Sequence, residues 1–226
     1  MEVRLSKADI DTLQAVYPIN QSVRIVANNN ELRVMDVSKT RAVLAKLETP
    51  FPRQFCIYDV REFLQVLNLF KEPVLDFTSP NYVVVKSADG TQRVQYMDAH
   101  PDSIKSYFER DIPVGTPDVE VVVTGAQLEL VSKAASSMRL EYVGFQSVNG
   151  KIVLTAFNQV NGGDASSSIV VELGDTDATF NLFYNTAVLN MLSGDCKFQL
   201  TRKCLSRVEN DGRVYFITMS KDSTYA

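Results

Sequence analysis

The sequence has little of what most enzymes and metal proteins need. Its single histidine, His100, lies directly before a proline in a polar stretch, which is typical of a surface loop and not of a general base. The three cysteines, Cys56, Cys196 and Cys204, are too few and too scattered for a disulfide framework or a tetrahedral metal site. The chain also lacks a dinucleotide-binding glycine motif, a phosphate-binding loop and a nucleophile elbow. We therefore predict a protein that is not an enzyme and that uses no cofactor and no metal.

Long hydrophobic runs and an excess of positive charge are missing as well. No stretch of about 18 apolar residues is present that would span a membrane, and the charged first residues do not predict a signal peptide. Together with the few cysteines, these features favour a reducing cytoplasm. The formal net charge of −4 argues against a protein that is held on nucleic acid by bulk attraction to phosphate. With 226 residues and 45% hydrophobic residues, the chain is long enough for one large domain or two smaller ones.

The chain does contain amphipathic helices and short strands, in the same order in both halves. Apolar residues at helical spacing predict helices over residues 6–17, 59–71, 125–139 and 185–193. In the first half, strands are predicted at residues 3–5, 22–26, 32–37, 41–47, 54–58, 74–77, 82–86 and 93–97. In the second half they are predicted at 119–123, 142–147, 151–157, 167–173, 179–183, 197–201, 205–208 and 213–219.

Three pairs of similar segments indicate an internal duplication. Residues 5–13 match 123–131, residues 63–67 match 188–192, and residues 94–96 match 214–216. Their common order and nearly constant separation predict an α+β fold in which a β-α-β₄-α-β₃ unit occurs twice. We expect domains at residues 1–98 and 119–226, joined by a proline-containing surface connector at residues 99–118.

The sequence resembles the DNA polymerase sliding clamps of T-even-type phages. The similar segments lie at residues 5–7, 19–20, 57–60, 63–64, 99–101, 150–153, 157–158, 173–175 and 222–224. The resemblance implies that each half is a clamp domain with two helices packed on curved antiparallel sheets, and that three chains form a six-domain ring. It further implies a homotrimer that encircles double-stranded DNA and tethers the replicative DNA polymerase after loading by an ATP-dependent clamp loader. Late-transcription factors are a further partner class, and the cytoplasm of an infected bacterial host is the expected location.

The resemblance places the polar sides of the helices toward DNA. The DNA-facing residues are then Lys7, Gln14, Arg61, Gln65, Asn68, Lys71, Lys133, Ser136, Arg139 and Asn190. Charges in the four predicted helices cancel, so the surface is less acidic than the rest of the chain but not basic. An ordinary solvated helix face explains these residues equally well. A ring holds DNA by topology, so a few exchangeable contacts are sufficient for sliding.

The resemblance also assigns a subunit interface and a pocket for a partner peptide. The interface residues are Arg93, Val94, Gln95 and Tyr96 of one strand and Ser167, Ser168, Ile169, Val170 and Val171 of another. The second strand has no charge to guard an exposed edge, although an ordinary internal strand is an equal alternative. The pocket residues are Ile104, Tyr107, Phe108, Ile112, Ile217, Met219 and Ser220. Alternatively, the connector side chains fold back onto the second domain as a small core.

A different class of function also fits a duplicated β-rich chain without a catalytic site. A structural or virion protein would build a ring from such domains without enclosing DNA. Retention on circular DNA distinguishes the two, because only a loaded clamp stays bound until the DNA is cut.

Overall fold

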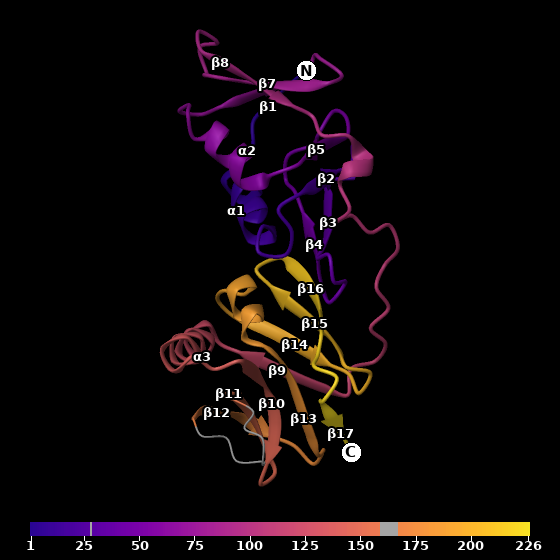
Figure 1. Ribbon diagram of the computed structural model, residues 1–226, viewed down its shortest axis with the longest axis vertical. Helices are drawn as coiled ribbons and strands as arrows, with labels where there is room; N and C mark the ends of the chain where they lie inside the picture. The colour runs from indigo at the N-terminus through magenta and orange to yellow at the C-terminus, as the bar shows by residue number, and fades with distance from the viewer. Residues whose placement is uncertain (28, 159–166) are drawn as a thin grey trace. The chain divides into compact units, whose positions relative to one another are not determined.

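The computed structural model describes residues 1–27, 29–158 and 167–226, and the chain divides into two compact units (Figure 1). The first unit is Met1–Asp111 and the second is Ile112–Ala226. Their boundary lies inside residues 99–118. Each unit has sheets, helices and a core of its own.

The first unit contains two antiparallel sheets. Its elements are β1 (Glu2–Val3), α1 (Lys7–Val16), β2 (Val23–Ile25), β3 (Glu31–Met35), β4 (Arg41–Lys46), β5 (Phe55–Ile57), α2 (Val60–Leu67), β6 (Val74–Asp76), β7 (Tyr82–Lys86), β8 (Arg93–Met97) and the 3-10 helix η1 (Pro101–Ser103). One sheet has the order β1-β6-β7-β8. In the other, β5, β2, β3 and β4 pair in that order.

The second unit has the same plan with one added strand. Its elements are β9 (Val119–Val123), α3 (Gly125–Met138), β10 (Tyr142–Val148), β11 (Lys151–Phe157), β12 (Ser168–Asp175), β13 (Phe180–Asn185), the 3-10 helix η2 (Thr186–Met191), β14 (Cys196–Leu200), β15 (Leu205–Asn210), β16 (Arg213–Thr218) and β17 (Thr224–Tyr225). Strands β9, β14, β15 and β16 pair in that order. The other sheet has the order β12-β11-β10-β13-β17.

The two units confirm the predicted duplication, because equivalent strands have equivalent neighbours. β1, β6, β7 and β8 correspond to β9, β14, β15 and β16, while β5, β2, β3 and β4 correspond to β13, β10, β11 and β12. A match of strand order as well as chain order does not follow from composition. It shows that one supersecondary plan was used twice.

The helices begin where side chains cap their first turns. Ser6 and Thr124 open α1 and α3 with reciprocal capping boxes, and Asp59 accepts the first free amides of α2. The prediction extended the second helix to residue 71, but α2 ends at Leu67. Two i→i−3 bonds then tighten the chain, and Glu72 adopts a positive φ of 53° before the next strand.

The fourth predicted helix differs in type, since η2 is a six-residue 3-10 helix. Asn185 caps it through Ala187, as expected from the sequence. The β-branched Thr186 and Val188 lower helix propensity, and the segment is too short for an α-helix to gain much from its own hydrogen bonds. Packing of Val188, Leu189 and Met191 into the core fixes η2 instead.

In each unit the core lies where the two sheets and a helix meet. In the first unit, Phe55 of β5 contacts Phe63 of α2 and Tyr96 of β8 edge-to-face, with ring centroids 5.4 Å and 6.3 Å apart. In the second, Phe145 of β10 packs on Phe198 of β14 at 4.8 Å. These contacts leave the outer sides of the helices free.

Candidate nucleic-acid interface and strand edges

The two helical segments of each unit lie next to each other and present one polar surface. α1 contacts α2 in the first unit, and α3 contacts η2 in the second (Figure 1). All ten residues predicted to face DNA are exposed: Lys7, Gln14, Arg61, Gln65, Asn68, Lys71, Lys133, Ser136, Arg139 and Asn190. We call this set the helix surface. Asn68 caps the end of α2, and Lys71 lies in the bend beyond it.

The cations of the helix surface are mostly free of acidic partners. Lys133 pairs with Glu129 one turn earlier on α3, with Nζ 2.5 Å from the carboxylate. The other four, Lys7, Arg61, Lys71 and Arg139, form no ion pair within the described part of the chain. The Arg61 guanidinium lies 4.7 Å from the ring centroid of Tyr17, which restrains it without neutralising its charge.

Exposed acids lie on the same helices and keep the surface close to neutral. Asp11, Glu62 and Glu129 are all solvent-exposed. At physiological salt, such interspersed charges allow weak contacts to phosphate and do not create a deep attractive potential. The arrangement suits brief, exchangeable contacts with a polyanion and is too weak for tight binding.

A groove between α3 and η2 adds residues that the sequence did not single out as site residues. At one end, a hollow of about 330 Å³ is lined by Ser132, Thr186 and Leu189 together with Ser136, Arg139 and Asn190. At the other, a hollow of about 540 Å³ reaches Gly125 and Gly194. The helical spacing of Ser132 and Ser136 is the one sequence signal for this groove, since the position of η2 follows from tertiary packing.

Arg139 occupies an unusual backbone conformation at the end of α3. Its φ of 53° and ψ of 47° are left-handed, and its amide donates to the carbonyls of Ala135 and Ser136. Glycine is the preferred residue in such a cap because it has no Cβ. The arginine is thus held on the helix surface at some conformational cost.

The two strands predicted to meet at a subunit interface are both edge strands. β8 pairs only with β7, and β12 pairs only with β11, within the described residues. In β8, Arg93, Gln95 and Met97 are exposed while Tyr96 is buried in the aromatic core. Burial, with nearby charges of Glu62 and Asp59, raises the pKa of Tyr96 to about 12, and its hydroxyl donates to the Asp59 carbonyl.

β12 is the more open of the two edges. No residue of this strand is buried, and Val170 is 57% exposed. Ile169 and Val171 are half-buried on the opposite face, while Ser167 is exposed just before the strand begins. Both edges therefore present unpaired backbone groups and uncovered apolar side chains, as pairing edges do.

The seven residues predicted for a partner pocket are divided between the units. Ile104, Ile217 and Met219 are buried, whereas Tyr107, Phe108, Ile112 and Ser220 are half-buried.

The first part of the predicted connector packs on the first unit. The buried Ser106 accepts the Met35 amide at 2.7 Å through its carbonyl and donates to the Ser22 carbonyl at 2.7 Å through its hydroxyl. The guanidinium of Arg24 lies over Tyr107, and that of Arg33 lies over Phe108. These contacts are with the first unit, whereas a small core on the second domain was one of the alternatives that the sequence left open.

Catalytic and metal-binding groups are sparse in the described residues. His100 is exposed and caps η1 by accepting the Asp102 amide at 3.3 Å. Within residues 1–27, 29–158 and 167–226, no three His, Cys, Asp or Glu side chains come together as metal ligands. Over the same residues, no helix has the length and apolarity that crossing a membrane requires.

Comparisons with known proteins point in one direction. No family model matches the chain. The chain is 27% identical over 223 residues to a sliding clamp of Vibrio phage KVP40, an alignment that covers 95% of this chain and 98% of the relative. This similarity confirms the resemblance to phage sliding clamps.

Solved structures show the same fold at low sequence identity. Proliferating cellular nuclear antigen (PCNA) from Entamoeba histolytica superposes with a TM-score of 0.70 at 11% identity, covering 97% of this chain and 98% of that one. A. fulgidus PCNA with the C-terminal region of FEN-1 bound gives 0.70 at 14% identity, covering 98% of each chain. PCNA from Thermococcus kodakaraensis gives 0.71 at 16%, covering 97% of this chain and 99% of that one. The fold of this chain is the PCNA-like sliding-clamp fold.

Proposed function

We propose that this chain, which has the fold of a sliding clamp, encircles duplex DNA and tethers the replicative DNA polymerase for processive synthesis. The observation that carries the proposal is the exposure of all ten helix-surface residues in a chain that is similar to a phage clamp over almost its whole length. The protein acts without catalysis of its own. Its site of action is the cytoplasm of the infected bacterial host.

The working form is a head-to-tail homotrimer with six domains. Among the described residues, each chain has one free edge on β8 and another on β12, in different units. Copies joined through these edges form a heterologous contact, the type that closes into a ring when the rotation between neighbours is one third of a turn. The PCNA-like fold supports the ring, and opening for DNA entry is the task of an ATP-dependent clamp loader.

DNA is retained by enclosure and not by affinity. The near-neutral helix surface has four cations that form no ion pair among the described residues, and it supplies contacts that are screened by salt and exchange quickly. Because no base-specific contact is required, the ring slides on any sequence. Each time the polymerase leaves the primer end, attachment to the ring returns it at high effective concentration.

A short segment of the polymerase is the expected tether. In one structurally similar complex, the C-terminal region of FEN-1 is bound to A. fulgidus PCNA. We assign the corresponding role here to residues 104–112 and 217–220, and the half-buried Tyr107 and Phe108 are the side chains available to a partner. The clamp loader and late-transcription factors are candidates for the same surface.

Retention on circular DNA tests the proposal. The purified chain is loaded on nicked plasmid by the clamp loader of the same genome with ATP, and the DNA is then separated by gel filtration in high salt. We expect the protein to remain on circular plasmid and to leave after a restriction enzyme linearises it. Equal loss from circular and linear DNA would contradict the proposal and favour a structural ring. Light scattering provides the companion measurement, with a trimer expected at three times the 25.2 kDa chain mass.

A further inference from the structure

The free edges of β8 and β12 match in length and in their alternation of faces. β8 has five residues, and its exposed and inward side chains alternate from Arg93 to Met97. β12 pairs regularly with β11 over residues 168–172, which is also five residues, before Leu173 bulges out of the register. A bulge ends regular pairing and bends the strand, so only residues 168–172 offer a straight edge.

The face alternation restricts how these edges can meet. In an antiparallel pair, residues directly opposite each other share a face of the sheet. Exposed residues of β8 must therefore oppose Ser168, Val170 or Glu172, and the inward Tyr96 must oppose a half-buried residue of β12. Only registers that differ by two residues satisfy this condition, and each such step moves the strand by about 7 Å.

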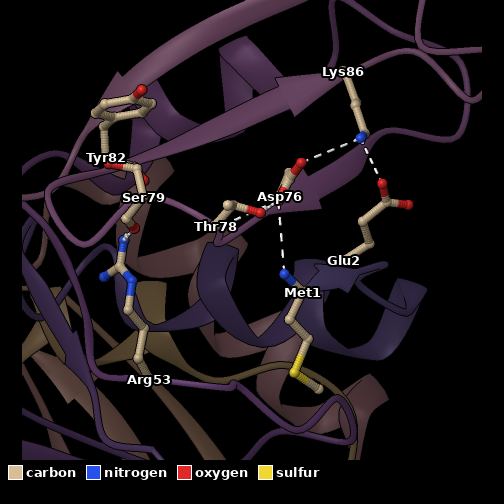
Figure 2. A network of polar contacts seen from close by, with 8 residues as sticks. All are labelled: Met1, Glu2, Arg53, Asp76, Thr78, Ser79, Tyr82 and Lys86. Carbon is tan, nitrogen blue, oxygen red and sulfur yellow. Dashed lines mark hydrogen bonds and ion pairs between the residues drawn. The ribbon is translucent and has the colours of Figure 1, made fainter.

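Charge selects one of these registers. Arg93 has no acidic partner within the described residues, and the residue opposite it on β7 is another cation, Lys86. Figure 2 shows that the carboxylates near Lys86 are already engaged, because its Nζ lies 2.6 Å from Glu2 and 3.3 Å from Asp76. Like charges on opposite residues are unfavourable. An acidic residue opposite Arg93 on its open side would offset this repulsion.

Glu172 is the complementary group on the other edge. It is exposed, it forms no ion pair in the described chain, and the cation on the adjoining strand, Lys151, is held by Asp175 at 2.5 Å. Arg93 is the first residue of β8, and Glu172 is the last residue before the bulge in β12. Antiparallel pairing brings these two ends together, whereas parallel pairing separates them.

We infer that β8 of one copy pairs antiparallel with β12 of the next copy in a single register, in which Arg93 forms an ion pair with Glu172. The opposed pairs are Arg93–Glu172, Val94–Val171, Gln95–Val170, Tyr96–Ile169 and Met97–Ser168. The ion pair lies on the outer face, and the apolar pairs continue the inner face across the boundary. This inference rests on the proposed ring, and it adds the residues that set the register.

Charge reversal tests the ion pair. Arg93→Glu and Glu172→Arg are each expected to weaken one interface about fivefold, and hence the equilibrium among three chains about a hundredfold. The double variant should return to within about threefold of the wild type. Lys203→Glu is the matched control for Arg93→Glu, because Lys203 is exposed and free of ion pairs among the described residues, and its reversal lowers the net charge by the same amount. Sedimentation equilibrium measures the dissociation constants, and circular dichroism confirms that each variant is folded.

Cysteine cross-linking tests the register directly. In a Cys204→Ser background, Gln95→Cys with Val170→Cys should give covalent dimers and trimers on oxidation, because opposed positions are close enough for a disulfide. Gln95→Cys with Ser168→Cys, one step out of register, should not.

Several outcomes would overturn the inference. A wild-type trimer with unaffected single variants, or no recovery in the double variant, would reject the ion pair and leave the ring intact. Cross-links within one chain, or equal linking by both cysteine pairs, would reject the register. A wild type that never forms a trimer would reject the proposed ring and this inference together.

Discussion

Replacing Asp9 by alanine is expected to loosen α1 far more than the equivalent change loosens α3. Both helices begin with a capping box, but the two boxes differ in their surroundings. The Asp9 carboxylate is 1% exposed and accepts the Ser6 amide at 3.0 Å, the Glu48 amide at 2.7 Å and the Thr49 hydroxyl. It therefore caps the helix and also ties it to the segment after β4.

In α3 the acceptor is Gln127, which serves its own helix only. Its Oε1 accepts the Thr124 amide at 2.9 Å and the Thr124 hydroxyl at 3.0 Å, both at the surface. Losing a local exposed cap costs about 0.5 kcal/mol. Losing Asp9 removes charged hydrogen bonds and leaves partly buried amides unpaired, which costs about 3 kcal/mol.

Hydrogen exchange with mass spectrometry measures each helix in the same sample. A loss of about 3 kcal/mol corresponds to about a hundredfold faster exchange in α1 of Asp9→Ala. Gln127→Ala should change α3 by about twofold to threefold. Unchanged protection of α1 in Asp9→Ala, or equal effects of the two variants, would refute the reasoning. The result bears on function because Lys7 and Gln14 of the helix surface depend on the position of α1.

Three further predictions concern the helix surface, the hairpin between β3 and β4, and the core of the second unit. Arg61→Glu should raise the diffusion constant of the loaded ring along DNA about threefold at moderate salt and less at high salt, whereas Lys203→Glu should not. Equal diffusion constants of Arg61→Glu and the wild type would remove Arg61 from the DNA contact. Burial opposes ionisation of Asp36, but hydrogen bonds from its hairpin lower its pKa from 3.8 to about 2. The Asp36 carboxylate therefore contributes about 2 kcal/mol to the free energy of unfolding above pH 4, and this contribution is lost as the pH falls toward 2. In urea titrations at a series of pH values, Asp36→Asn should make the free energy of unfolding fall less steeply over this acidic range. Gly144→Ala places a Cβ against the β13 backbone and should cost about 3 kcal/mol in thermal unfolding, whereas Gly174→Ala meets open space and should be nearly neutral.

Many elements of the fold were predictable because local signals and tertiary packing agree. β7, β8, β9 and β11 have the predicted bounds, since alternating apolar residues or a continuous apolar run stand between clear turn signals. α3 was recognised from its capping box and inward stripe. The second helix was predicted too long, because the apolar Phe70 continues the helical period after the backbone has turned away.

The candidate surfaces were only partly accessible to sequence reasoning. The helix-surface residues could be named because helical spacing determines which side chains oppose the apolar stripe. The groove between α3 and η2 could not, since it depends on how two segments distant in sequence pack together. The connector side chains could not be assigned either, because a hydrophobic residue in a linker does not specify the unit on which it packs.

The sequence by itself determined the repeat, the capped helices and the absence of a catalytic or metal-binding pattern, because these follow from spacing and residue type along the chain. The tertiary structure decided which strands are left at sheet edges, and it placed Arg93 and Glu172 there without an ion-pair partner in the part of the chain that it describes. It also buried the carboxylate of Asp9 and ended regular pairing of β12 at Leu173. Such features depend on contacts between residues far apart in the chain. The residue types and spacing within a single segment do not specify those contacts.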